Sequence, residues 1–335
     1  MTSRSLRLGL ALTAVALALL ALGSAHAEMT FSGYAQIRLN EYDSALDNSD
    51  GFDLRRVRLK CAGTLNGQGT RAVVQIDLSK LDDRDDNEVV LKDAFVQHPF
   101  TEEWSGRLGY TTVPFGFEEE YSASKRLPLE RSKAARTFFS GDAETGLYAL
   151  YTPREARSPE LVLGYSNGLH DWGKAASNGD QDREAHAWLA RVQWKLPHGG
   201  AAGVSYQSAT RDRTVGGNPV SLDNNCLGAH LRWNGERGLG LQGEYYTGEI
   251  LSVDSSGWYA QIEYAPGPHK VMPFYRYDEF EDGIAGHSMY RAHTLGAAYE
   301  HDKNGRVTVQ WEQYDDLKGG NFGNFGLQYQ FKYSG

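Results

Sequence analysis

The sequence predicts an all-β protein, a transmembrane antiparallel β-barrel of about 16 strands. Three observations favour this fold class. Segments of about ten residues with alternating polar and apolar side chains recur from one end of the chain to the other. The connections between these segments alternate between short and long, as the periplasmic turns and extracellular loops of an outer-membrane barrel do. The first residues carry the pattern of a secretory signal.

The N-terminal segment combines a charged start, an apolar run and a cleavage pattern. Arg4 and Arg7 supply the charge, residues 8–22 are apolar, and residues 25–27 form an A-x-A site. The apolar run is shorter than the about 20 residues that a helical membrane span needs. We therefore expect residues 1–27 to be a signal peptide and residues 28–335 to form an outer-membrane barrel domain in a bacterial cell.

Sixteen segments have the alternation and length of barrel strands. In the last of them, Phe325, Leu327 and Tyr329 alternate with smaller or polar residues, which is typical of a wall with lipid outside and water inside. In chain order the expected strands are 30–41, 53–65, 70–80, 89–98, 104–112, 145–152, 160–167, 185–196, 201–211, 224–234, 239–249, 256–265, 269–278, 288–301, 306–314 and 322–333.

The second expected strand has a basic residue at every other position, namely Arg56, Arg58 and Lys60. On the lipid face each of these charges would cost roughly 2–4 kcal/mol near the bilayer midplane, so we expect all three to face the lumen. The same alternation sets Arg55 at the outer rim of the wall. It places eight more basic residues inside: Arg38, Arg107, Arg191, Lys195, Arg232, Lys270, Arg276 and Lys332. Because a pore selects by the charges that line it, this row predicts a preference for anions, although the whole chain carries a formal charge of −9.

The connection over residues 113–144 is far longer than an ordinary loop, and loops of this length are usually functional or disordered. Its apolar residues, such as Phe115 and Phe138, favour packing over free solvation. We expect it to be the third extracellular loop and to fold into the barrel as a constriction; the alternative is a loop that lies on the surface. The run Glu118–Glu120 would weaken anion binding there. Five basic residues lie in it: Lys125, Arg126, Arg131, Lys133 and Arg136.

Four stretches of the first half resemble the landmarks of the phosphate-selective porin O/P family. They are FDLRRVRLKCAGTLNG (52–67), VVLKDAFVQHPF (89–100), GRLGYTTVPFGFEE (106–119) and LPLERSKAARTFFSG (127–141). The resemblance is close over residues 30–150 and general beyond them. It implies a sixteen-stranded, homotrimeric outer-membrane channel with its third loop in the pore. In such a channel arginines and lysines guide anions, such as phosphate or other inorganic and organic anions, by passive diffusion.

Two other functions stay open at this point. The barrel could sheathe a partner protein such as a cytochrome, which would need a wide and empty lumen. It could also be a barrel enzyme, which would need a nucleophile, a base and an orienting group in place, and the ten scattered histidines show no such motif. We expect no cofactor and no metal site, and the acidic total argues against a nucleic-acid partner. The expected partners are outer-membrane lipid, lipopolysaccharide and small anions.

Overall fold

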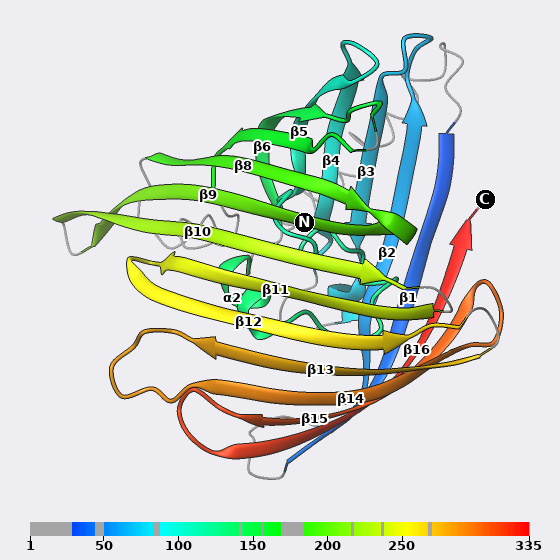
Figure 1. Cartoon of the computed structure of the whole chain (residues 1–335), viewed down its shortest axis with the longest axis vertical. Helices are drawn as coiled ribbons and strands as arrows, with labels where there is room; N and C mark the ends of the chain where they lie inside the picture. The colour runs from blue at the N-terminus through cyan, green and yellow to red at the C-terminus, as the bar shows by residue number, and fades with distance from the viewer. Residues whose placement is uncertain are drawn as a thin grey trace, which may run out of the picture.

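Sixteen strands form a closed antiparallel barrel in the computed structural model (Figure 1). The structure describes residues 29–43, 50–82, 88–140, 143–155, 157–168, 184–215, 218–235, 238–266 and 270–334. The expected signal peptide, residues 1–27, lies outside these ranges. Each strand pairs with its neighbours in the sequence, and β1 pairs with β16 to close the wall.

Most strand bounds follow the expected segments, and the predicted barrel is confirmed. The exceptions are the ninth and tenth strands, which run to Val215 and from Asn218 and so are longer than the expected 201–211 and 224–234. The strands are β1 (Met29–Tyr42), β2 (Gly51–Thr64), β3 (Arg71–Asp77), β4 (Val90–Pro99), β5 (Trp104–Thr112), β6 (Ala143–Tyr151), β7 (Glu160–Ser166), β8 (Glu184–Leu196), β9 (Gly200–Val215), β10 (Asn218–Asn234), β11 (Leu239–Ile250), β12 (Val253–Tyr264), β13 (Val271–Glu281), β14 (Tyr290–Glu300), β15 (Gly305–Asp315) and β16 (Asn321–Ser334).

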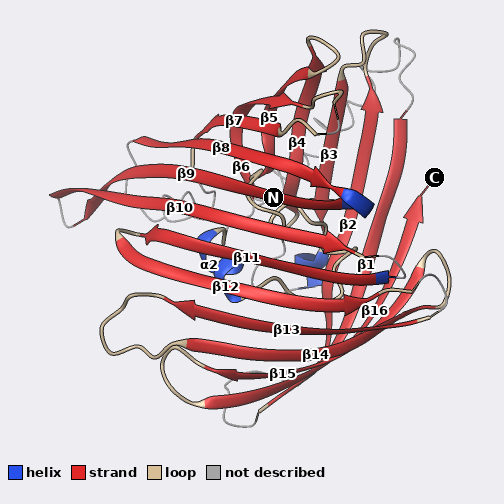
Figure 2. Ribbon diagram, in the orientation of Figure 1, coloured by secondary structure: helices blue, strands red, loops and turns tan. Residues whose placement is uncertain are grey.

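Within the residues that the structure describes, helical structure is confined to short segments (Figure 2). The α-helix α2 (Lys133–Phe138) packs against β11, β12 and β13, and two 3-10 turns cover Ser79–Asp82 and Pro197–Gly199. Within the described ranges no helix is both long enough and apolar enough to cross a bilayer.

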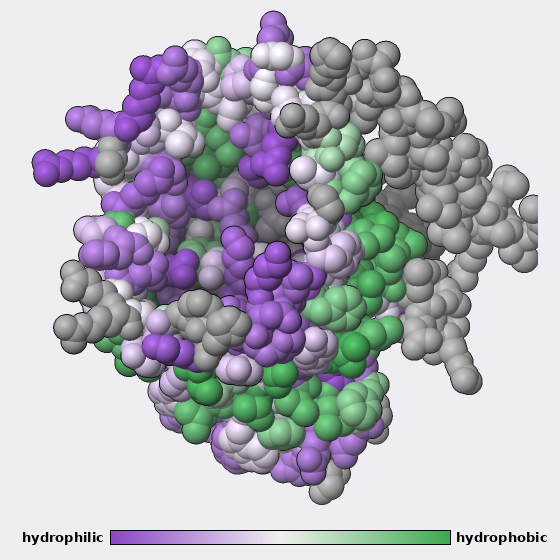
Figure 3. All heavy atoms as spheres, turned by 90° about the vertical axis from the view of Figure 1, so that its right-hand side faces the viewer, coloured by the Kyte–Doolittle hydropathy of each residue, from purple (hydrophilic) through white to green (hydrophobic). Residues whose placement is uncertain are grey.

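The two faces of the wall differ in the way that the alternation predicts. Leu108, Leu163 and Leu295 point outward and each keep more than half of their surface exposed, while the inward-facing Gln36 and Gln330 are buried. Figure 3 faces the end that carries the short turns, and hydrophilic side chains surround the hollowed centre of that face. An apolar outer face suits the hydrocarbon of a bilayer, and a polar inner face suits water.

Two β-bulges interrupt the alternation in neighbouring parts of the wall. Arg55 is an extra residue in the β1–β2 ladder, and Lys92 is an extra residue in the β3–β4 ladder. A bulge re-aims the side chains beside it, so that two neighbours in sequence can point to the same face. Arg55 and Arg56 therefore both reach the lumen, and so do Lys92 and Asp93. From the sequence alone it stayed open which face of β4 points to the lumen, because Lys92 and Asp93 are adjacent charged residues. The bulge lets both side chains point there.

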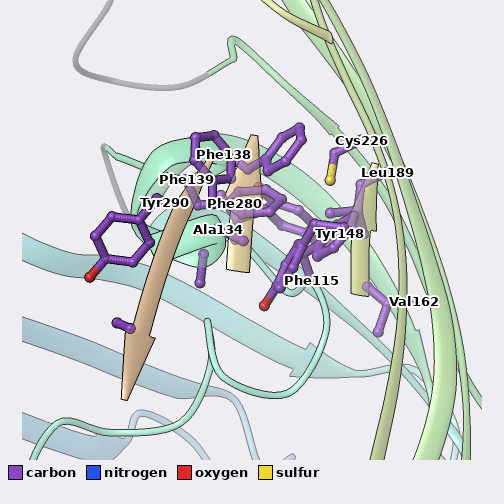
Figure 4. Close-up of a cluster of buried hydrophobic side chains, with 14 residues drawn as sticks. Phe115, Ala134, Phe138, Phe139, Tyr148, Val162, Leu189, Cys226, Phe280 and Tyr290 are labelled. Atoms are coloured by element: carbon purple, nitrogen blue, oxygen red, sulfur yellow. The ribbon is translucent and has the colours of Figure 1, made fainter. Parts of the chain in front are cut away.

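The largest cluster of buried apolar side chains lies on the inner side of the wall (Figure 4). Phe115, Phe138 and Phe139 come from the connection between β5 and β6, and they pack with Tyr246 of β11 and Phe280 of β13. The rings of Phe115 and Phe139 have centroids 4.6 Å apart, and Phe138 meets Phe280 edge-on at 6.4 Å. This connection is the third one at its end of the barrel, after those that join β1 to β2 and β3 to β4.

Candidate functional site

The segment between β5 and β6, residues 113–140 of which are described, is tied to the inner wall by buried polar groups. Glu118 accepts hydrogen bonds from the backbone N and the Oγ of Ser132, at 3.0 and 2.6 Å. Arg276 of β13 lies 3.5 Å from Glu118, pairs with Asp278 at 2.7 Å and donates to the backbone oxygen of Glu130 at 2.8 Å. The segment is therefore folded back on itself and fixed to the wall by one buried arginine.

The start of the segment is fixed by Glu244 of β11. Its carboxylate accepts from the backbone N of Phe117 at 3.1 Å, from the backbone N of Glu118, and from the Tyr246 hydroxyl at 2.7 Å. Gly116 has a φ of +58° and touches Glu244 so closely that a Cβ would displace this carboxylate. The P-F-G turn thus needs its glycine both for the backbone conformation and for the close approach.

Three arginines of the wall converge on one carboxylate of the segment. Arg38 Nη1 and Arg55 Nε lie 2.8 and 2.7 Å from Glu130 Oε1, and Arg56 Nη2 lies 2.9 Å from Oε2. Burial acts to raise the pKa of Glu130, but the guanidinium groups of Arg56, Arg55 and Arg38 outweigh it and hold that pKa well below its usual range. Glu130 is therefore ionised at neutral pH and neutralises one of the three positive charges.

The predicted row of lumen cations is present, but its members are not equally free. Arg56 is engaged by Glu130, and Arg58 Nε lies 3.0 Å from Asp77 Oδ2. Lys60 forms no salt bridge with any residue that the structure describes. Acidic partners that are distant in sequence thus reach two of the three cations in this row, and Lys60 is the exception among the described residues.

A cavity of ≈ 510 Å³ opens between this row and the segment. It is bounded by β2, β3 and β4 on the wall side and by residues 119–140 on the other, and we call it the basic chamber. Its basic lining residues are Arg55, Arg56, Arg58, Lys60, Lys80, Lys92, Arg126, Arg131 and Arg136. The acidic ones are Asp77, Asp93, Glu119, Glu120 and Glu130, so nine basic side chains face five acidic ones. The chamber therefore carries a net positive charge.

Arg126 is the least compensated cation of the chamber. Only 7% of its surface is exposed, and its Nε and Nη1 have no hydrogen-bond partner among the described residues. Burial lowers the pKa of Arg126 to about 9, and the nearby Arg56 and Arg131 act in the same direction. The group still carries its proton at neutral pH, so a charged donor lines the cavity with two atoms unsatisfied.

The acidic run Glu118–Glu120 lies within the segment, and its three carboxylates do not all face the chamber. Glu118 turns away to Ser132 and Arg276, Glu119 pairs with Arg131, and Glu120 pairs with Arg191. Each carboxylate of the run is therefore matched by a basic or polar partner. This pairing limits the weakening of anion binding that the sequence led us to expect from the run.

The other basic residues expected in the constriction lie within the same segment. Residues 123 and 124, just before Lys125, accept hydrogen bonds from Gln36 of β1 and Gln330 of β16, which sets Lys125 against that part of the wall. The Lys133 Nζ lies 5.3 Å from the ring centroid of Tyr290, and Arg136 lies in the last turn of α2 and lines the chamber.

The remaining lumen arginines and lysines lie outside the chamber. Arg107 rests over the ring of Phe95 at 4.7 Å, and Lys195 pairs with Glu160 at 2.8 Å. Arg232 lies 4.8 and 5.0 Å from the ring centroids of Phe117 and Tyr121, two residues of the segment. The structure thus gathers Arg38, Arg56, Arg58 and Lys60 with the segment's cations, and leaves Arg107, Arg191, Lys195 and Arg232 elsewhere on the inner wall.

Sequence reasoning did not single out Arg55, Lys80, Lys92 or Glu130 as site residues, although all four line the chamber. Strict alternation put Arg55 at the rim of the wall, whereas the bulge brings its guanidinium to Glu130. Glu130 was noted only as an acid among the basic residues of the segment. Its position beside Arg131 and Ser132 gives no signal that three arginines would meet on it, because those arginines lie in β1 and β2.

Comparisons with known proteins agree with this architecture. The family model described as phosphate-selective porin O and P matches residues 32–287. A search of curated proteins finds no match. Among solved structures, an anion-selective porin from Comamonas acidovorans is 14% identical with a TM-score of 0.67, covering 92% of this chain and 100% of its own.

Two further solved structures share the barrel. The trimer form of OmpT, an outer membrane protein of Vibrio cholerae, is 14% identical with a TM-score of 0.65, over 92% of this chain and 99% of its own. The outer membrane channel DcaP of Acinetobacter baumannii is 11% identical with a TM-score of 0.65, over 92% of this chain and 97% of its own. At these identities the likeness concerns the fold.

Proposed function

This chain belongs to the phosphate-selective porin O and P family, and from that premise we propose that the basic chamber is the selective part of its channel. The protein is a porin of the bacterial outer membrane, and its fold is that of a channel rather than of an enzyme. It lets small hydrophilic solutes diffuse down their gradients and prefers anions. The segment over residues 113–140 narrows the passage.

The net charge of the chamber carries the proposal. Nine basic side chains face five acidic ones at the place where the segment approaches β2, β3 and β4. A narrow, low-dielectric passage lined by one sign of charge raises the local concentration of counter-ions and repels ions of the same sign. Lys60 and Arg126 are the cations that we expect to contribute most, because Lys60 forms no salt bridge within the described residues and two donor atoms of Arg126 have no hydrogen-bond partner there. The acidic total of the chain does not oppose this, since selectivity depends on the lining.

The interior of the barrel argues against the sheath function. The aromatic cluster around Phe115 and Phe138 fills part of the lumen and is anchored by buried ion pairs. A partner protein would have to displace this packing. We propose instead that the partners are outer-membrane lipid and lipopolysaccharide on the outside, small anions in the lumen, and two further copies in a homotrimer, as in the trimer form of OmpT.

The reversal potential of the purified porin in a planar bilayer under a KCl gradient tests the proposal. We expect a reversal potential shifted toward the equilibrium potential of chloride. The shift should be smaller for Lys60→Gln, which removes a chamber charge. Lys303→Gln, in the turn between β14 and β15, is the matched control and should leave the potential unchanged. Added phosphate that blocks chloride current would narrow the preferred solute to phosphate. A reversal potential shifted toward the equilibrium potential of potassium in the unmodified protein would refute the proposal.

A further inference from the structure

Two of the three arginines around Glu130 are also held by groups other than Glu130. The Nη1 of Arg56 donates to the Gln36 side-chain oxygen at 3.0 Å. The Nε and Nη2 of Arg38 donate to the Gln328 side-chain oxygen at 3.1 and 2.8 Å. Because neutral amides of β1 and β16 hold Arg38 and Arg56, the positions of these two guanidiniums do not depend on the carboxylate alone, whereas Arg55 is held by Glu130 itself.

The cluster has the chemistry of an anion-binding site. Its three guanidinium groups place donors on both oxygens of one carboxylate, at 2.7 to 2.9 Å. Such charge-assisted hydrogen bonds are among the strongest polar contacts in proteins. The carboxylate supplies one negative charge against three positive ones, so the cluster keeps a net positive charge even when it is filled. It also borders the basic chamber, which Arg55, Arg56 and Glu130 line.

We infer that Arg38, Arg55 and Arg56 form a carboxylate cradle that the channel's own Glu130 occupies as a built-in competitor. Passing anions are thereby excluded from the deepest positive site and follow the chamber past Lys60 and Arg126. Glu130 is then a specificity-determining residue, which keeps anions moving by denying them a tight resting place. This inference rests on the proposed function, and it adds the carboxylate as the ligand class of the cradle.

A purely anchoring role for the Glu130 side chain is the alternative. The backbone around it has contacts of its own, and of their donors only Arg38 is also a partner of the Glu130 side chain. Arg276 donates to the backbone oxygen of Glu130 at 2.8 Å, and the backbone N of Leu129 donates to the Gln310 side chain at 3.0 Å. Arg38 Nη2 also lies 3.3 Å from the Leu129 oxygen. Truncation of the side chain should therefore empty the cradle and leave the segment in place.

The test uses Glu130→Ala, with acetate as the probe. Chloride current is recorded in planar bilayers while acetate is added, for the unmodified porin, Glu130→Ala and Glu120→Ala. Glu120→Ala is the matched control, because it removes the same charge from another residue that lines the chamber. Within the described residues, Glu120 forms a salt bridge with Arg191 alone. Glu130→Ser provides a second vacated cradle if the alanine variant does not fold.

We expect a saturable acetate block in Glu130→Ala, with half-block at an acetate concentration about tenfold lower than in the other two proteins. A shift of the chloride preference without such a block, equal in Glu130→Ala and Glu120→Ala, would mean that Glu130 acts only as a nearby charge and would overturn the inference. Coinciding acetate curves for all three proteins would overturn it as well. Both results leave the proposed function standing, whereas a potassium-side potential in the unmodified porin would refute that function alone.

Discussion

Replacing Arg276 with methionine should release the segment over residues 113–140 from the wall. Arg276 is 1% exposed and is the shared partner of Asp278 at 2.7 Å and Glu118 at 3.5 Å. Both partner carboxylates are almost fully buried. Removing the cation leaves them uncompensated, and breaking a buried pair in this way costs roughly 3–5 kcal/mol. The hydrogen bond to the Glu130 backbone oxygen is lost at the same time.

The cost translates into a change in the population of the undocked segment. Every 1.4 kcal/mol is a factor of ten, so the undocked population should rise on the order of a hundredfold to a few thousandfold. Trypsin reports this population, because it cleaves after Lys125 and Arg126 only when the segment leaves the wall. When docking is fast relative to cleavage, the cleavage rate follows the undocked population. Single-channel conductance should increase in parallel, since the constriction opens.

Arg291→Met is the matched control for this experiment. Arg291 also pairs with a carboxylate, Glu279 at 3.5 Å, but half of its side chain is exposed on the outer face. Surface pairs of this kind contribute roughly 0–1 kcal/mol, so the variant should resist trypsin as the unmodified porin does. If Arg276→Met is cleaved no faster than Arg291→Met, the buried ion pair does not hold the segment and the reasoning fails.

Three further outcomes follow from the structure. Arg126→Gln should lower the chloride preference without speeding tryptic cleavage after Lys125, because it removes an unsatisfied buried charge rather than a paired one; the reversal potential and the cleavage rate at Lys125, the site that this variant keeps, check this. Leu108→Arg should lower the free energy of unfolding of the barrel in lipid vesicles by roughly 2–4 kcal/mol, since Leu108 is 62% exposed on the outer face. An unchanged urea unfolding midpoint would contradict that orientation. The pKa of Glu130 is depressed, so the effect of its charge is complete above its ordinary value of 4.5 and is lost as pH falls through the lower value in the folded protein. The difference in reversal potential between the unmodified porin and Glu130→Gln should therefore stay constant from pH 7 to 4.5 and shrink only well below pH 4.5; a difference that fades at pH 6 would contradict the three-arginine contact.

The sequence was sufficient for the barrel because its signal is local. Outward leucines and aromatics alternate with polar residues along each strand, and the sorting of loops by length needs no knowledge of contacts. The same alternation placed Arg56, Arg58 and Lys60 on one side of β2, and all three line the basic chamber. It predicted the cations but not their partners, because pairing joins residues such as Arg58 and Asp77 that lie on different strands.

Alternation also failed wherever the backbone departs from regular pleating. The bulge at Arg55 adds a cation to the lumen that a period of two assigns to the other face. The bulge at Lys92 does the same in β4, and this is why alternation alone did not show which face of that strand points to the lumen. The three-arginine cradle depends on the first of these bulges. A sequence pattern therefore predicted the wall of the pore better than its deepest site.

Substitutions and changes of strand length affect this wall differently, and the two bulges matter for the changes of length. A substitution at a regular position changes one face of the barrel at a time. Insertion or deletion of one residue in a strand shifts every later side chain to the opposite face, unless a bulge absorbs it. Deletion of Arg55 or of Lys92 would remove one lumen cation and restore regular pairing, with the lipid-facing residues kept in place on both sides. Single-residue length changes at these two points thus offer a route by which pore charge can vary among related chains without cost to membrane insertion.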